Sequence, residues 1–200
     1  MHSMKILIST PSYQHQVNNE MVMSLLRVIE DLKKNNIAVN WHSPTSSQLA
    51  FNRNIACDLA IKDQYDFLLF WDGDISVQEP HFVREMIQTS YKHDASVVGL
   101  PVVLKGSPKT YNCIIGGGTN LTKVEDRPFE VSRIGTGVML IRTALLKSMI
   151  PPWFQFTEGY NQQPTCTPED WGFCSKIKEE KIFADPRFHV QHWGLYAYES

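Results

Sequence analysis

The chain has 200 residues, of which 42% are hydrophobic and 20% charged, and its formal net charge is −2. This composition predicts a single globular domain over residues 1–200 and excludes a disordered or low-complexity chain. The small net charge excludes a general attraction to nucleic acid or to an anionic membrane, so any anionic ligand must be held by a few local groups.

Two further classes of protein are disfavoured by the sequence. No apolar run is long enough to span a bilayer and the first residues lack a signal-peptide core, so we expect a cytoplasmic protein with no membrane span. Four cysteines without a Cys-x-x-Cys pair argue against a zinc site or a disulfide framework. We expect them to be reduced and mostly buried: Cys57, Cys113, Cys166 and Cys174.

The first half of the chain alternates between two periodicities. Strand patterns at 4–10, 37–41 and Phe67–Trp71 enclose helical apolar spacing at 22–32 and 48–62. This β-α-β-α-β order predicts a right-handed, doubly wound, mostly parallel sheet with helices on both faces.

The second half begins with a helix over 82–91 and a buried strand at 95–100. Residues 101–133 carry short strand-like pieces and a glycine turn, and we expect them to form a small antiparallel excursion over the ligand crevice. A strand at 135–141 then returns to the sheet. The remaining expectations are a short helix from Thr143, a polar loop over 157–167, a helix from Pro168 and an extended segment over 183–193.

Two carboxylates follow the most apolar strand, in the sequence Asp72-Gly73-Asp74. Glycine permits a sharp turn, so both acids can reach the same small space. A divalent cation with oxygen ligands is a natural partner for such a pair. Ligands of open α/β sheets bind at the carboxyl ends of strands, which is where this pair lies. The alternative is a plain turn that ends the strand.

Further motifs accompany the acidic pair in a fixed order. Together they resemble the nucleotide-sugar-dependent glycosyltransferases of the GT-A fold, and the resemblance extends from about residue 5 to 194. The motifs are Thr10-Pro11-Ser12-Tyr13, Arg53-Asn54, Asp72-Gly73-Asp74, Gly135-Thr136-Gly137, Glu169-Asp170 and His192-Trp193-Gly194.

The resemblance implies a metal site that bridges the diphosphate of the donor. Asp74 would be the direct ligand, Asp72 would meet the ribose or the metal's waters, and His192 would complete the set, with His189 as a weaker choice. Imidazole with carboxylate suits Mn²⁺, with Mg²⁺ as the alternative ion. The alternative for either histidine is a purely structural role, with the ring packed beside a tryptophan.

The resemblance also implies contacts with the donor. The backbone near Thr10 and Pro11 and the ring of Tyr13 would meet uracil and ribose, although Tyr13 could equally be a half-buried turn residue. Arg53 offers a forked donor to phosphate or to the base edge, and its alternative is a surface arginine. Gly135 and Gly137 would let the sugar or acceptor approach the backbone, or would mark a strand bulge.

Glu169 and Asp170 admit two interpretations. Thr167-Pro168-Glu169-Asp170 fits a helix start, with a threonine N-cap and an acid three positions later as a capping box. The family instead places the base that deprotonates the acceptor hydroxyl at such a helix start. We assign Asp170 as the base, with Glu169 as an acceptor-binding alternative.

The sequence thus implies a metal-dependent transferase that moves sugar from a UDP-sugar donor to a hydroxyl of a glycan or glycoprotein acceptor. Direct displacement with Asp170 as base would invert the anomeric centre. A haloacid-dehalogenase-like phosphatase shares the apolar strand and Asp-x-Asp pattern, but there the motif opens the domain. A non-catalytic module that binds nucleotide or glycan on the same fold is the other alternative.

Overall fold

A seven-stranded sheet forms the centre of the computed structural model, which describes residues 3–12, 16–106, 109–161, 163–177, 179–194 and 197–199. In spatial order its strands are β2 (Ala38–His42), β1 (Lys5–Ser9), β3 (Phe67–Trp71), β9 (Val138–Arg142), β5 (Val97–Gly99), β12 (Ile182–Ala184) and β7 (Phe129–Val131).

Five of these strands share one direction. β1 is parallel to β2 and β3, and β12 is parallel to β5. β9 lies between β3 and β5 and is antiparallel to both, and β7 is antiparallel to β12. The expected mostly parallel sheet is therefore confirmed, and the returning strand enters it against the direction of its neighbours.

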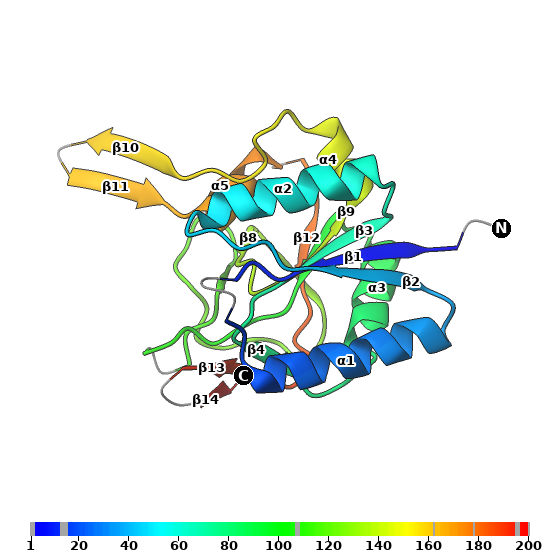
Figure 1. Ribbon diagram of the computed structural model, residues 1–200. Coiled ribbons are helices and arrows are strands. Elements are labelled where there is room, and N and C mark those ends of the chain that lie inside the picture. The colour runs from blue at the N-terminus through cyan, green and yellow to red at the C-terminus, as the bar shows by residue number, and fades with distance from the viewer. Residues whose placement is uncertain are drawn as a thin grey trace.

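Helices cover both faces of the sheet (Figure 1). One face packs against a core that includes Ala56, Phe154 and Phe173, and the other against a core that includes Leu25, Val28 and Phe82. The first face carries α2 (Leu49–Lys62), α4 (Thr143–Ser148) and α5 (Glu169–Lys176), and the second carries α1 (Asn19–Lys34) and α3 (Phe82–His93).

Among the described residues, three small antiparallel sheets accompany the central one. One of them, formed by residues 113–114 and 133–134, lies in the expected excursion, which is thereby confirmed as antiparallel, and the second is formed by strands outside it. The third is a hairpin that projects from the body in Figure 1. They consist of β6 (Cys113–Ile114) with β8 (Arg133–Ile134), β4 (Ile75–Val77) with β13 (Val190–Trp193) and β14 (Ala197–Glu199), and β10 (Thr157–Asn161) with β11 (Gln163–Thr167).

Helix α1 forms as its sequence predicts. Asn18 caps its first turn by accepting a hydrogen bond from the backbone N–H of Glu20 at 2.8 Å, and its apolar stripe is buried. None of the helices that the structure describes combines the length and apolar character needed to cross a bilayer.

Helix α2 differs from expectation in the face it buries. The apolar spacing over 48–62 predicts that its apolar residues are inside, but Leu49 and Ile55 are 36% and 38% exposed, whereas Asn52 and Arg53 are 2% and 1% exposed. The reason is that the first half of α2 covers the polar ends of the strands rather than the apolar middle of the sheet. The alternative of a surface arginine at position 53 is thereby wrong.

The segment 157–167 also differs, because it was expected to be a loop. Thr157 pairs with Thr167 and Asn161 with Gln163 in an antiparallel hairpin. With only two strands, every residue lies on an edge, where proline and glycine are tolerated. The second strand of this hairpin leads directly into α5, so the hairpin lies next to the start of that helix.

Candidate functional site

A cavity of about 510 Å³ opens where β1 and β3 end. Four of the residues predicted for the site line it, namely Pro11, Asp72, Gly73 and Asp74. Sequence reasoning did not assign the others to the site; four of them lie between β1 and α1, and Leu49 is the first residue of α2. These are Ser12, Gln16, Val17, Asn18 and Leu49.

The Asp72-Gly73-Asp74 turn is held on both sides by backbone hydrogen bonds. The N–H of Asp72 donates to the carbonyl of Gly137 at 2.8 Å, and the N–H of Asn18 donates to the carbonyl of Gly73 at 2.6 Å. A Cβ on Gly73 would lie 3.0 Å from Cγ1 of Val17, so a larger residue at 73 would require the Val17 side chain to shift.

Two nitrogen groups surround the carboxylate of Asp74. Lys105 Nζ donates to Oδ2, and Nε2 of His192 lies 3.5 Å from the same oxygen. Burial acts to raise the pKa of Asp74, but hydrogen bonds and charge from His192 and Lys105 outweigh it and hold the pKa below its usual range. Nδ1 of His192 lies 2.8 Å from the carbonyl oxygen of Val103.

That contact assigns the tautomer of His192. A carbonyl oxygen can only accept, so Nδ1 must carry the proton. In the neutral ring the lone pair is then on Nε2, which faces the Asp74 carboxylate. A cation between two electron-pair donors that face one another in this way would be held by both of them.

A buried arginine joins Asp72 to helix α5. Arg53 Nη2 lies 3.3 Å from Oδ1 of Asp72, and Nε lies 3.3 Å from Oε1 of Glu169. Loss of hydration raises the pKa of Asp72 to about 6. The positive charge of Arg53 acts to lower this pKa, and the negative charge of Asp74 acts to raise it. The third nitrogen of Arg53, Nη1, has no hydrogen-bond partner among the residues described.

Asp170 lies next along α5, partly buried. Its Oδ1 accepts a hydrogen bond from the N–H of Trp171 at 2.7 Å, and the backbone of Thr136 also donates to it. Burial, followed by the charge of Glu169, raises the pKa of Asp170 above its usual range. A raised pKa brings a carboxylate closer to the proton affinity that a general base needs near neutral pH.

The capping box expected at the start of α5 does not form. Pro168 occupies the N-cap position, and no side chain donates or accepts a cap hydrogen bond there. The threonine at 167 belongs to β11 instead. The predicted capping box between Thr167 and Asp170 is therefore wrong. Glu169 contacts Arg53 on α2, and Asp170 accepts hydrogen bonds from the N–H of Trp171 in its own helix and from the backbone of Thr136.

Three residues predicted to contact the sugar donor instead contact other residues of the protein. Thr10 is fully buried, and its Oγ1 accepts from the indole N–H of Trp41 at 3.0 Å. A Cβ on Gly135 would meet the Asn112 side chain at 2.8 Å, and one on Gly137 would meet the end of Ile75 at 2.8 Å. Close packing thus accounts for both glycines.

Two further sequence predictions concern His189 and Tyr13. The backbone of His189 contacts Gln78 and Glu79, so His192 is the histidine that the structure brings to Asp74. Tyr13 lies outside the described residues.

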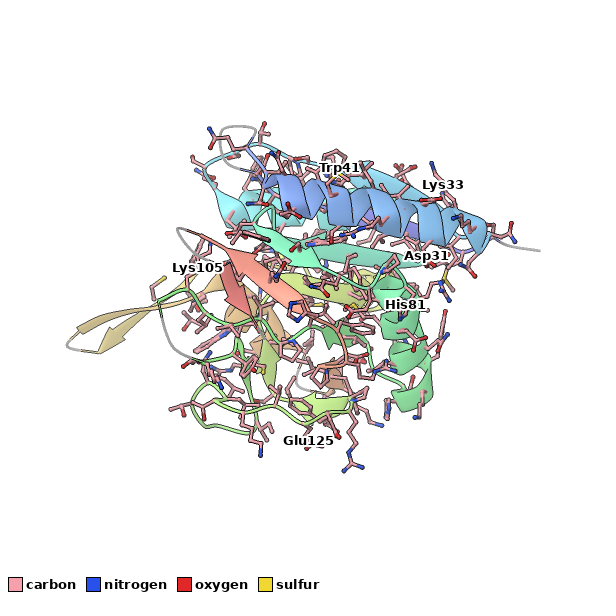
Figure 2. The ribbon with its side chains drawn as sticks, turned by 90° about the horizontal axis from the view of Figure 1, so that it is seen from below. Asp31, Lys33, Trp41, His81, Lys105 and Glu125 are labelled. Atoms are coloured by element: carbon pink, nitrogen blue, oxygen red, sulfur yellow. The ribbon has the colours of Figure 1, made fainter. Side chains whose placement is uncertain are left out.

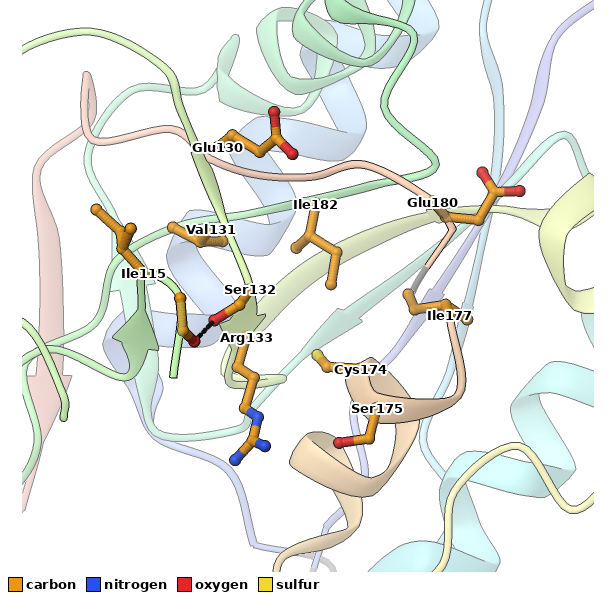
Figure 3. A pocket seen from close by; sticks show the side chains of 11 residues that line it. Ile115, Glu130, Val131, Ser132, Arg133, Cys174, Ser175, Ile177, Glu180 and Ile182 are labelled. Atoms are coloured by element: carbon orange, nitrogen blue, oxygen red, sulfur yellow. Dashed lines mark hydrogen bonds between the residues drawn. The ribbon is translucent and has the colours of Figure 1, made fainter. Parts of the chain in front are cut away.

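A second cavity of about 470 Å³ lies between β7, β8, β12 and the far half of α5 (Figure 3). None of the residues predicted for the site lines it. Arg133 at its edge stacks over the ring of Trp171, with the guanidinium carbon 5.3 Å from the ring centre. This cavity is therefore separate from the one at the acidic turn.

No family model and no curated protein matches this sequence. Solved structures do match it. A197 from STIV has a TM-score of 0.69 and 23% identity over 96% of this chain and 86% of that chain. A mutant of Drosophila β-1,4-galactosyltransferase 7, in complex with manganese, UDP-Gal and xylobiose, has a TM-score of 0.53 and 14% identity over 91% and 65%.

A third solved structure is UDP-glucose pyrophosphorylase in complex with UDP-glucose, with a TM-score of 0.51 and 11% identity over 92% of this chain and 90% of that chain. At identities this low the likeness shows a shared fold and nothing finer. The fold of this chain is the GT-A-like fold that its motifs predict.

Proposed function

We propose that this protein is a metal-dependent glycosyltransferase that moves a sugar from a UDP-sugar to a hydroxyl of a glycan or protein acceptor. The proposal rests above all on the meeting of Asp74 and His192 with a cationic side chain where β3 ends, beside an open cavity. The two similar folds whose structures hold UDP-Gal with manganese and UDP-glucose support a UDP-sugar as donor.

The residues at the acidic turn fit a divalent cation. Asp74 offers oxygen and His192 offers the Nε2 lone pair, a donor set that suits Mn²⁺ and, less well, Mg²⁺. The Lys105 ammonium on the same carboxylate oxygen shows that a positive charge is accommodated there. A bound cation would stabilise, as a Lewis acid, the charge that develops on the departing diphosphate.

The protein would supply few ligands to this ion. Among the described residues no group of three or more His, Cys, Asp or Glu is arranged to hold a metal. The remaining positions would be filled by donor phosphates and water, as is usual for cations that act on nucleotides. Asp72, already bonded to Arg53, would meet the ribose or the ion's waters.

The donor would lie in the cavity that Pro11, Ser12 and the turn line. Arg53 is buried beneath the residues that line this cavity and is not exposed to solvent. Its main role would therefore be to hold Asp72 in place. Nη1, which has no hydrogen-bond partner among the described residues, keeps its two N–H groups for the base edge or for a water that bridges to it.

Asp170 would accept the proton of the acceptor hydroxyl. The Thr136 and Trp171 backbones orient its carboxylate, and its raised pKa increases its basicity. Glu169 is 6% exposed and bonded to Arg53, which leaves it less able to reach an acceptor. Attack by the deprotonated hydroxyl would displace the diphosphate directly and invert the anomeric centre.

A thermal-shift screen of UDP, GDP and their sugar derivatives, with and without Mn²⁺, tests the proposal. Only uridine compounds with metal should raise the melting temperature, and a ligand at 100 times its Kd should stabilise the protein by about 2.7 kcal/mol. Asp74→Ala should abolish the shift, whereas Asp58→Ala, in an exposed pair with Lys62, should keep it. A shift by UDP without metal, or no shift at all, would contradict the proposal.

A second candidate is nucleotidyl transfer, since UDP-glucose pyrophosphorylase shares the fold over nearly the whole of both chains. The products separate the two reactions. Sugar transfer releases UDP, whereas pyrophosphorolysis consumes inorganic diphosphate and releases UTP. Formation of UTP from a UDP-sugar and diphosphate would replace the first proposal with the second.

A further inference from the structure

The segment Val103-Leu104-Lys105 contacts both residues proposed to hold the cation. The carbonyl of Val103 accepts from Nδ1 of His192 at 2.8 Å, and Lys105 Nζ donates to Oδ2 of Asp74. In Figure 2, Lys105 lies beside β13, the strand that carries His192. Nothing in the sequence motifs pointed to this segment.

The backbone of the segment is fixed while the lysine side chain is free to move. Leu104 N–H donates to the carbonyl of Thr110 at 2.7 Å, and Val103 bridges to Tyr111. The side chain of Lys105 is 38% exposed, and its four-carbon stem lets the ammonium move without moving the backbone. The carbonyl that orients His192 can therefore stay in place when the ammonium leaves.

Lys105 and a divalent cation would compete for one oxygen atom. Both are positive, and Asp74 Oδ2 already receives Lys105 and faces Nε2 of His192. Like charges at contact distance repel, so an ion that enters between the carboxylate and the imidazole must displace the ammonium. A displaced ammonium stays tethered beside the site by its own side chain.

We propose that Lys105 is a built-in counterion that leaves Asp74 when the cation binds and then pairs with the diphosphate of a nucleoside diphosphate. This inference rests on the proposed function. The compact ammonium is well suited to a phosphate oxygen. Metal alone must displace the lysine at a cost, whereas metal with nucleotide gives the lysine a new partner, so each ligand strengthens the binding of the other.

Two binding measurements on the purified full chain test this. The first is Mn²⁺ binding without nucleotide, followed by electron paramagnetic resonance, and the second is UDP binding at saturating Mn²⁺, followed by calorimetry. Because the pair with Asp74 is half-exposed, Lys105→Ala should raise Mn²⁺ affinity by about two- to fivefold. It should lower UDP affinity by about tenfold or more, the usual effect of losing a charged hydrogen bond.

Lys62→Ala is the matched control, because Lys62 also pairs with an aspartate but lies on the exposed side of α2, and it should change neither affinity. A rise in Mn²⁺ affinity together with a fall in UDP affinity in Lys105→Ala is the result that identifies the proposed role of Lys105. A lower Mn²⁺ affinity in Lys105→Ala, or two unchanged affinities, overturns the role of Lys105 alone. Absence of Mn²⁺ and UDP binding in the unmodified protein overturns the proposed function with it.

Discussion

Arg53 controls the positions of two carboxylates that come from distant parts of the chain. It is 1% exposed and contacts Asp72 and Glu169. Removing one member of a buried ionic cluster leaves the other charges without compensation, which commonly costs about 3 kcal/mol or more. We expect Arg53→Met to lower the free energy of unfolding by about that amount, as measured by urea denaturation.

The pH dependence of this loss identifies its cause. Without Arg53, the two carboxylates repel with no opposing charge between them, and the pKa of Asp72 in the folded state rises further, because the charge and the hydrogen bond of Arg53 act to lower it. Protonation at about pH 5 should then relieve part of the destabilisation seen at neutral pH. Glu169→Gln in the Arg53→Met background should restore part of the stability as well. A loss that is equal at both pH values and unaffected by Glu169→Gln would indicate a packing defect instead.

Asp170 has the raised pKa expected of a base. Asp170→Asn should reduce turnover by about 10²–10⁴-fold while UDP binding with Mn²⁺ is unchanged. Initial-rate kinetics and calorimetry measure the two effects. Asp126→Asn, at an exposed position, is the control and should retain full activity. Full activity of Asp170→Asn would leave this residue without a chemical role.

If the protein transfers sugar as proposed, the rate of the unmodified protein should also depend on pH through Asp170. Only the ionised carboxylate accepts a proton, so kcat/KM should rise with pH as Asp170 ionises. Since burial raises its pKa, that rise should lie at higher pH than for an ordinary aspartate. The rise should disappear in Asp170→Asn, measured at an enzyme concentration high enough to give a detectable rate. A rise that persists belongs to another group, such as Asp72, with its pKa of about 6.

At the level of single residues, the sequence locates groups that follow strands. Asp72 and Asp74 could be predicted because they end a buried strand, and strand ends meet at one edge of the sheet. The contact between Arg53 and Glu169 spans 116 residues, and no local pattern encodes it. Lys105 was missed for the same reason, because its contact depends on the path of the excursion.

Helix α5 depends on a glycine in its first turn. A Cβ on Gly172 would lie 2.8 Å from the backbone carbonyl oxygen of Gln155, which cannot move as a side chain could. Gly172→Ala should therefore destabilise the fold by about 1–3 kcal/mol, although alanine favours helices. Chemical denaturation measures this. Gly117→Ala is the matched control, because a Cβ there meets nothing within 4 Å. Equal stability of both variants would contradict the packing explanation.

Most elements could be predicted from periodicity, and the exceptions have physical causes. The strand β3 matches its predicted bounds because it is apolar throughout and buried on both faces. The hairpin of β10 and β11 was missed because glycine, proline and polar residues interrupt it, which a free-standing edge pair tolerates. The first turns of α2 were misassigned because Asn52 and Arg53 are buried there, with Arg53 contacting Asp72 and Glu169.

The architecture of the whole molecule follows from the order of its elements. The β-α-β-α-β start produces the parallel strands β1, β2 and β3, with α1 and α2 on opposite faces. The direction of β9 could not be predicted, because an excursion of more than thirty residues, about 101–133, permits either sense of return. The antiparallel insertion of β9 brings the carbonyl of Gly137 to the turn at Asp72.

The two acids of the turn are attached to opposite sides of the sheet. Asp72 is bonded through Arg53 to α2 and α5, whereas Asp74 contacts His192 on β13, whose strand partner β4 packs with α1. A single glycine separates these attachments. We therefore expect a relative displacement of the two helical layers to alter the spacing between the carboxylates, and with it the affinity of this edge for a ligand.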